Sequence, residues 1–343
     1  MPTPSPAAPP QARRMLTVAL LVLTVVTLAL WAFAWPAART APRDLPLGVA
    51  GPATAAAPVQ EQLERREGAF DLHRYADEAE ARAAIEARTV YGAVVVTGKD
   101  PKVAGNEPKL LTATAASPVV AQLLQQAVTA GAPDGARVTT VDVVPAPAAD
   151  PRGAALGSSV LPMAIGGVAA GALVTLLGLR GIRAVGTLVL ATTLVGLAAA
   201  ALADSWLGIL TGDWWAEAGV LALSSLAVAA TVAGLAALLG PAGIGAGALL
   251  MVLLGNPFSG VTSAPELLPE PIGVIGQLLP PGAGGSLLRS TAFFDGAAAT
   301  GPAVTLAVWA ALGLAAVLAG GRRGRNEPEA SAPSTARQPA PVG

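Results

Sequence analysis

The feature that most constrains this chain is a set of six apolar stretches, one of them alone and five clustered, with a long polar stretch between. The first apolar stretch covers residues 15–36, the polar stretch residues 37–156, and the cluster residues 157–321. An apolar helix of about 20 residues matches the thickness of the bilayer core and satisfies its own backbone groups there. The sequence therefore predicts a membrane α-helical bundle with six transmembrane helices and a domain inserted after the first.

Composition supports this class of fold. Hydrophobic residues make up 53% of the chain and charged residues 13%, whereas soluble domains carry about 25% charged residues.

The fifth span is short and follows the Gly240-Pro241 turn, so a broken hairpin is an alternative there. Ala32-Phe33-Ala34 resembles a signal-peptidase site, but the apolar run before it is longer than usual and favours an uncleaved anchor. The predicted spans are residues 15–36, 157–179, 184–203, 217–239, 241–256 and 302–321.

Arginines at the span ends predict the orientation. With six spans, every arginine cluster falls on one side, which the positive-inside rule assigns to the cytoplasm. We expect a multi-pass protein of the cell (plasma) membrane with both termini cytoplasmic and residues 37–156 outside. Tryptophans near the opposite span ends agree with this orientation, because indoles favour the membrane interface. The arginines are Arg13, Arg14, Arg180, Arg183, Arg322, Arg323 and Arg325, and the tryptophans are Trp31, Trp35, Trp206, Trp214 and Trp215.

The polar stretch 37–156 alternates strand and helix patterns and predicts an extracytoplasmic α/β or α+β domain. Asp77 and Glu80 predict the start of a helix over residues 77–88, in the manner of a capping box. The terminal stretches 1–14 and 322–343 are rich in Pro, Ala and Ser and are predicted to be disordered cytoplasmic tails. The predicted strands are residues 45–51, 70–76, 90–98, 109–115 and 137–144, and the other predicted helices are 58–66 and 118–130.

Residue types that carry chemistry are scarce. The chain has no cysteine and a single histidine, His73, so neither a histidine triad nor a multi-histidine metal site can be assembled. No glycine-rich phosphate loop is present, and Gly98-Lys99-Asp100 does not form one. A net charge of −1 gives no reason to expect nucleic acid as a partner. We therefore expect no catalytic residue, no metal site and no cofactor in this chain.

The spans themselves contain few titratable groups, which disfavours a carrier driven by ions. Asp213 and Glu217 are interpreted as solvated residues at the outer interface. Two glycine pairs with the small-xxx-small spacing are interpreted as packing surfaces. They are Gly167 with Gly171, and Gly243 with Gly247.

The proline-rich segment 257–300 is too broken to form one span. Its apolar pieces, residues 272–279 and 286–294, suit short helices in or at the outer interface, with Ser286 as a helix cap. We expect a re-entrant or interfacial hairpin that closes the outer end of a substrate path; an ordinary outer loop is the alternative. The candidate path or gate residues are Asn256, Pro257, Glu266, Glu270, Arg289 and Asp295.

Two local sequences and the overall layout carry a family resemblance. LPLGVAGP follows the first span, and DEAEARAAIEARTVYGAVVV places an Ala-rich helix before a strand. With one span, an outer domain, five clustered spans and an outer element before the last, the chain resembles permeases of the type-2 ABC transporter superfamily. The YhgE/Pip-like (phage infection protein) branch is the most similar, and NPFSG and LPPGAGGSLLRS are similar to its actinobacterial members.

This resemblance implies a permease that exports a lipid, peptide or drug-like substrate. It would pair with a second copy or a related permease in the lipid bilayer, and a cytoplasmic nucleotide-binding subunit would hydrolyse the ATP. The contact with that ATPase would fall on the short inner loop at Arg180 and Arg183. The alternative is a non-transporting envelope protein whose outer domain binds a partner or phage.

Overall fold

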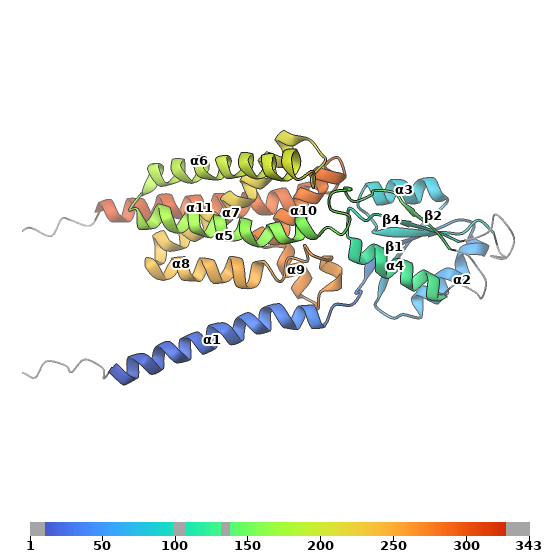
Figure 1. Cartoon of the computed structure of the whole chain (residues 1–343), viewed down its shortest axis with the longest axis horizontal. Helices are drawn as coiled ribbons and strands as arrows, with labels where there is room; N and C mark the ends of the chain where they lie inside the picture. The colour runs from blue at the N-terminus through green and yellow to red at the C-terminus, as the bar shows by residue number, and fades with distance from the viewer. Residues whose placement is uncertain (1–10, 99–107, 132–137, 327–343) are drawn as a thin grey trace, which may run out of the picture.

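The computed structural model describes residues 11–98, 108–131 and 138–326. Long helices lie side by side and form a bundle, and a β-sheet with its own helices lies at one end of it (Figure 1). Both ends of the described chain lie at the opposite end of the bundle, away from the sheet (Figure 1). The sheet and both ends of the described chain are therefore separated by the length of the bundle.

Five helices are long and apolar enough to cross a membrane, by length and composition. They coincide with five of the predicted spans, and the prediction of a helical membrane protein is confirmed at this level. Their polar side chains also suit a membrane, because threonine hydroxyls on these helices donate to backbone carbonyl oxygens one turn back. Thr231, for example, donates to the Ala227 carbonyl oxygen. The helices are α1 (Gln11–Ala38), α5 (Ala154–Leu176), α6 (Gly181–Ala200) with its π-helical end η1 (Ala201–Trp206), α7 (Trp214–Leu239) and α11 (Thr300–Asn326).

The predicted span 241–256 is a shorter apolar helix, made of α8 (Pro241–Ala248) and the π-helical η2 (Leu249–Gly255). Its 15 residues cover roughly 22 Å, less than the ~30 Å of a bilayer core. The prediction of disordered tails is wrong for residues 11–14 and 322–326, which continue α1 and α11. The rest of both tails lies outside the described residues.

Helix α7 is the centre of the bundle. In the most apolar stretch of 18 residues in α7, 67% of the residues are buried, whereas in the corresponding stretch of α1 only 6% are buried. Small residues allow the close packing: a Cβ atom on Gly171 of α5 would lie 2.5 Å from the Ala229 carbonyl oxygen, and one on Gly313 of α11 would lie 2.4 Å from the Ala230 carbonyl carbon. Gly167, Gly243 and Gly247 make similarly close contacts with neighbouring chain, so the interpretation of both glycine pairs as packing surfaces is confirmed.

Residues between α1 and α5 form a five-stranded mixed sheet with the order β2-β1-β3-β4-β5. The pair β3–β4 is antiparallel and the other neighbouring pairs are parallel. Helices α2 (Ala53–Glu64), α3 (Glu78–Glu86) and α4 (Pro118–Gly131) connect the parallel strands. The strands are β1 (Leu45–Ala50), β2 (Phe70–Tyr75), β3 (Gly92–Val95), β4 (Lys109–Thr112) and β5 (Thr139–Asp142).

Most predicted elements of this region lie where expected. Asp77 caps α3 by accepting hydrogen bonds from the backbone N–H groups of Ala79 and Glu80, as predicted. Helix α2 differs, because it begins at Ala53, five residues before the predicted start, and contains Pro58 in its interior. Buried alanines on α2 pack against β1, and this tertiary contact outweighs the hydrogen bond that Pro58 cannot donate.

Opposite faces of the sheet bury two separate cores. Leu45, Leu47 and Val49 of β1 point to the face covered by α2 and α4, while Ala50 points to the face covered by α3. Residues far along the chain complete both cores: Ala264 and Leu267 join the first, and Phe294 joins the second. The segment 257–300 therefore attaches the sheet to the bundle on both faces.

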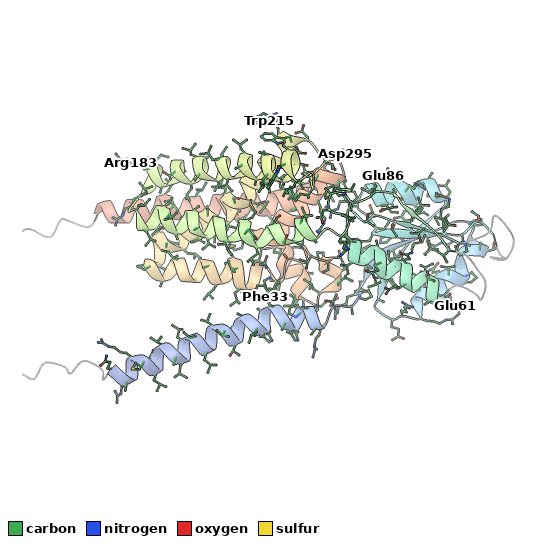
Figure 2. All side chains as sticks on the ribbon, viewed as in Figure 1. Phe33, Glu61, Glu86, Arg183, Trp215 and Asp295 are labelled. Atoms are coloured by element: carbon green, nitrogen blue, oxygen red, sulfur yellow. The ribbon has the colours of Figure 1, made fainter. Side chains whose placement is uncertain are left out.

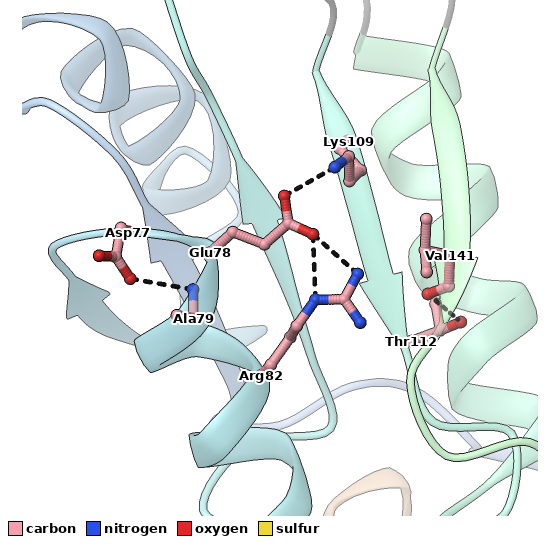
Figure 3. Close-up of polar contacts among 7 residues, drawn as sticks. All are labelled: Asp77, Glu78, Ala79, Arg82, Lys109, Thr112 and Val141. Atoms are coloured by element: carbon pink, nitrogen blue, oxygen red, sulfur yellow. Dashed lines mark hydrogen bonds and ion pairs between the residues drawn. The ribbon is translucent and has the colours of Figure 1, made fainter.

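An ion-pair cluster joins α3 to the sheet (Figure 3). The Glu78 carboxylate accepts hydrogen bonds from Lys109 Nζ of β4 at 2.7 Å and from Arg82 Nη2 of its own helix at 2.7 Å. The hydrogen bond from Lys109, followed by that from Arg82, lowers the pKa of Glu78 below its ordinary value of 4.5. The carboxylate therefore stabilises the fold where it is ionised.

The segment 257–300 contains the short helix η3 (Pro265–Leu267), α9 (Ile272–Gln277) and α10 (Pro280–Phe293). The predicted cap at Ser286 is wrong, because α10 begins six residues earlier with Leu279 as its N-cap. Pro280 and Pro281 occupy the first turn, where proline loses no intrahelical hydrogen bond. Ser286 instead donates from the interior of α10 to Gln277 Oε1 at 2.6 Å.

We expect Gly171→Ala to lower the free energy of unfolding by about 1–3 kcal/mol, because the added methyl group meets the α7 backbone and forces the two helices apart. Thermal unfolding of the purified protein in detergent measures the change. Gly166→Ala is the matched control on α5, since a Cβ atom there has no neighbour within 4 Å. Equal losses for the two variants would contradict the close packing.

Glu78→Gln is expected to lower stability by roughly 1 kcal/mol at neutral pH, the upper value for a partly exposed ion pair. A depressed pKa stabilises the fold above the unfolded value of 4.5 and loses this effect as pH falls through the lower folded value. The difference between variant and parent should therefore shrink toward zero in acid, as measured by urea unfolding across pH. Glu86→Gln, an exposed site on the same helix, should leave stability unchanged. A gap that persists at acid pH would refute this assignment.

Candidate functional site

A cavity of about 550 Å³ lies at the junction of sheet and bundle. Its lining includes residues 43–46 at the start of the sheet, the turn between α3 and β3, the stretch from η3 to α9, α10 and the start of α11. It lies at the end of the bundle that carries the sheet. Residues more than 170 positions apart in sequence therefore share one wall, as Tyr91 and Glu266 do.

Arg88 reaches the cavity from the end of α3. The helix ends at Glu86, and Arg88 adopts a left-handed backbone with φ of 59°, a conformation in which helices commonly end. Its side chain points to α10, where Nη1 donates to the Ser286 carbonyl oxygen at 3.0 Å and to Ser290 Oγ at 2.5 Å. The guanidinium carbon also lies 5.3 Å from the centre of the Phe294 ring, within the range of a cation–π contact.

Tyr91 and Glu266 form the second polar contact across the junction. The Tyr91 hydroxyl donates to Glu266 Oε2 at 2.8 Å, and the Tyr91 backbone N–H donates to the Pro46 carbonyl oxygen at 3.0 Å. Removal from water, reinforced by the Glu266 charge, raises the pKa of Tyr91 far above its ordinary value. The phenol therefore remains a hydrogen-bond donor at any physiological pH.

Arg289 forms the deepest part of the wall. It is only 6% exposed, and its Nη2 donates to the Val261 carbonyl oxygen. Its Nε atom is buried and has no hydrogen-bond partner among the described residues. A buried donor without a partner costs roughly 1–3 kcal/mol, more when charged. This site therefore contains unused hydrogen-bonding capacity.

Two of the arginines that line the cavity, Arg88 and Arg289, lack close counter-ions among the described residues. In the described ranges, neither Arg88 nor Arg289 has a carboxylate oxygen within 4.0 Å. Burial lowers the pKa of Arg88, and the nearby Tyr91 and Glu266 oppose that shift. Arginine nevertheless keeps its proton at neutral pH, so both guanidinium groups are cationic. The inner wall therefore carries positive charge that is held mainly by carbonyl and hydroxyl oxygens.

An apolar lip borders the cavity on α9. Val274 and Leu278 line the cavity and are 65% and 60% exposed. The Leu278 carbonyl oxygen accepts a hydrogen bond from Trp309 Nε1 of α11 at 2.8 Å, which fixes the end of α9 against the bundle. Exposed apolar side chains beside a bundle of membrane helices suit contact with lipid. The cavity thus has a polar inner wall and an apolar edge.

The structure brings together only part of the predicted site. Glu266, Glu270 and Arg289 line the cavity. Asn256 and Pro257, which follow η2, are absent from its lining, and Asp295 lies exposed in the turn after α10 (Figure 2). The proposed ATPase-contact residues Arg180 and Arg183 are exposed, and Figure 2 places Arg183 at the bundle end far from the sheet.

Sequence reasoning missed Arg88 and Tyr91. Both lie in a passage that predicts an ordinary helix followed by a strand, and nothing in it points to residues 266–290. The interpretation of Glu217 as a solvated residue is wrong: its side chain is fully buried, and Oε1 accepts a hydrogen bond from the Gly212 backbone N–H at 2.8 Å. Asp213 is exposed and caps α7 by accepting from the Ala216 backbone N–H.

The cavity has the size and the polar groups of a ligand-binding pocket. Its polar groups include guanidinium donors, a phenol donor and three carboxylates, and they surround a volume within the range of ligand pockets, about 300–1,000 Å³. Comparison with known proteins adds no relative: no family model, no curated protein and no solved structure matches this chain. The cavity itself is therefore the strongest indication of function.

Tyr91→Phe is expected to lower the free energy of unfolding by about 1–2 kcal/mol, because Glu266 loses a donor at a partly buried position. Thermal unfolding in detergent provides the measurement. In a Glu266→Ala background, which lacks the acceptor, the same substitution should cost much less, since the two side chains act on one another. Additive effects in this double-mutant cycle would show that the hydrogen bond contributes nothing.

Proposed function

We propose that this chain is the permease subunit of an ABC-type exporter, which moves an amphiphilic or drug-like substrate outward while a separate cytoplasmic subunit hydrolyses ATP. One observation carries the proposal: the segment 257–300 folds back onto the sheet end of the bundle as α9 and α10, between η2 and α11. This is the position of the outer re-entrant element in the type-2 ABC permeases that the sequence resembles. The cavity beneath the sheet then lies at the outer end of the path.

The proposal includes six membrane crossings, with the sheet outside and both termini in the cytoplasm of a cell-membrane protein. Both ends of the described chain lie at one end of the bundle, which supports an even number of crossings. The short helix α8–η2 therefore counts as a crossing, and a locally thinned bilayer or the neighbouring α9 covers its missing length. The sheet region 37–156 is then the inserted outer domain.

Within this scheme Asn256 and Pro257 mark the point where the short crossing leaves the membrane, since they directly follow η2. Glu266, Glu270 and Arg289 act at the cavity as the outer gate. The exposed inner loop with Arg180 and Arg183 is the contact for the ATPase. Helix α1 is packed loosely against the rest of the chain, which leaves its surface for lipid or for a second permease in a homodimer or heterodimer.

A second candidate is an envelope protein that binds a ligand or partner without transporting it. The observation in its favour is that the sheet domain supplies much of the cavity wall, so recognition needs no path through the bundle. This candidate predicts no dependence on an ATPase. Substitutions in the inner loop, far from the cavity, therefore distinguish the two candidate functions.

The permease should co-purify with an ATPase subunit from its own host after mild detergent extraction, and ATP should be hydrolysed by the complex. Arg180→Glu combined with Arg183→Glu is expected to lower the recovered ATPase activity at least about tenfold, because reversed charges oppose the docking surface. Arg65→Glu, an exposed charge reversal in the outer domain, is the control. Recovery of the intact chain with no ATPase would favour the second candidate.

Single-cysteine labelling tests the orientation on which this rests, since the chain has no native cysteine. Glu61→Cys should react with an impermeant maleimide in intact cells, and Arg183→Cys only after permeabilisation. Figure 2 shows these two positions at opposite ends of the molecule. Labelling of both in intact cells would overturn the proposed orientation.

A further inference from the structure

The inner wall of the junction cavity has the chemistry of an anion site. Arg88 and Arg289 both line it, and buried Arg289 Nε has no partner within the described part of the chain. The planar guanidinium group presents several N–H donors in a geometry that matches phosphate and carboxylate oxygens. Two cations on one wall repel one another when the cavity is empty of anions, and a bound anion would remove that cost.

The acidic residues near the cavity offset only part of this positive charge. On the inner wall the two guanidinium groups face one carboxylate, that of Glu266, which accepts a hydrogen bond from the Tyr91 hydroxyl. Asp44 and Glu270 line the rim, where both residues are exposed. Charges in water are screened over about 8–10 Å at physiological ionic strength, whereas buried charges are screened much less. The inner arginines therefore set the sign of the interaction.

Part of the cavity edge is apolar. Val274 and Leu278 of α9 combine cavity lining with high exposure, and Pro302 at the start of α11 continues this edge. A free phosphate ion would use the arginines and leave the apolar lip and much of the volume unfilled. An amphiphile uses both, with its charged group inside and its chains along α9 in the lipid.

We infer that the junction cavity binds a phosphate-bearing lipid, with its phosphodiester group at Arg88 and Arg289 and its acyl chains against Val274 and Leu278. The inference deepens the proposed function by naming the substrate class, and it rests on the outward placement of the sheet given there. The shared chemistry, a phosphate ester, is also present in soluble molecules. The experiment below separates the two sources.

The test uses the full-length protein in neutral detergent micelles, with binding measured by titration calorimetry. The probe is dioctanoyl phosphatidylglycerol; dioctanoylglycerol lacks the phosphate, and glycerol 1-phosphate lacks the chains. We expect binding of the complete lipid and at least about tenfold weaker binding of either fragment, since each loses one half of the contact. If glycerol 1-phosphate bound as tightly as the complete lipid, the inference that the ligand is a lipid would be wrong. If dioctanoylglycerol bound as tightly, the inference of a phosphate site would be wrong.

A matched pair of variants locates the site. Val274→Glu adds a negative charge at the cavity lip without removing any buried hydrogen bond, and should weaken lipid binding at least about fivefold through like-charge repulsion. Ile275→Glu adds the same charge at the next residue, which is 41% exposed and does not line the cavity, and should bind as the parent does. Equal effects of the two variants would overturn the assignment.

Arg289→Gln removes the deepest cation and should abolish the difference between the lipid and dioctanoylglycerol. If that variant unfolds, comparison of Val274→Glu with Ile275→Glu still tests whether the lipid binds in the cavity. These binding measurements require no ATPase and no transport. Absence of co-purification with an ATPase would contradict the permease proposal and leave the lipid site standing. Equal binding of the lipid and its fragments would contradict the lipid site and leave the permease proposal standing.

Discussion

The attachment of segment 257–300 to both faces of the sheet is the contact on which the site depends. Leu267 enters the core beneath α2 and α4, and Phe294 enters the core beneath α3. Arg88 then spans from the end of α3 to the α10 backbone. Because apolar burial on two faces holds the segment, its attachment does not depend on the polar contacts alone. The Nε atom of Arg289, which has no partner among the described residues, is therefore available to a ligand.

The bundle obeys a different constraint. In lipid there is no hydrophobic gain from bringing two apolar helices together, so close van der Waals contact has to stabilise the helix pairs. Helix α7 achieves this with alanine, glycine, serine and threonine, which let α5, α6 and α11 approach its backbone. Apart from Glu217, the buried polar side chains of α7 are serine and threonine hydroxyls. Polar recognition is consequently concentrated at the sheet end.

Most elements could be predicted, because each depends on a local pattern. Apolar runs locate α1, α5, α6, α7 and α11, and Asp77 correctly marks the start of α3. The prediction of a helix cap at Ser286 was wrong because two prolines, which usually break helices, occupy the first turn of α10. The prediction that Glu217 is solvated was wrong because its position near a span end indicates solvent, whereas the turn at Gly212 covers its side chain.

The sequence by itself determined that the chain is a helical membrane protein with one region able to form a sheet, since length, apolarity and periodicity are local properties. It also indicated Glu266, Glu270 and Arg289 as charged groups in an apolar segment. Only the tertiary structure decided that Arg88 and Tyr91 share a wall with them. The reason is physical: contacts between residues some 200 positions apart follow from how two cores close around one segment, and no local pattern encodes that closure.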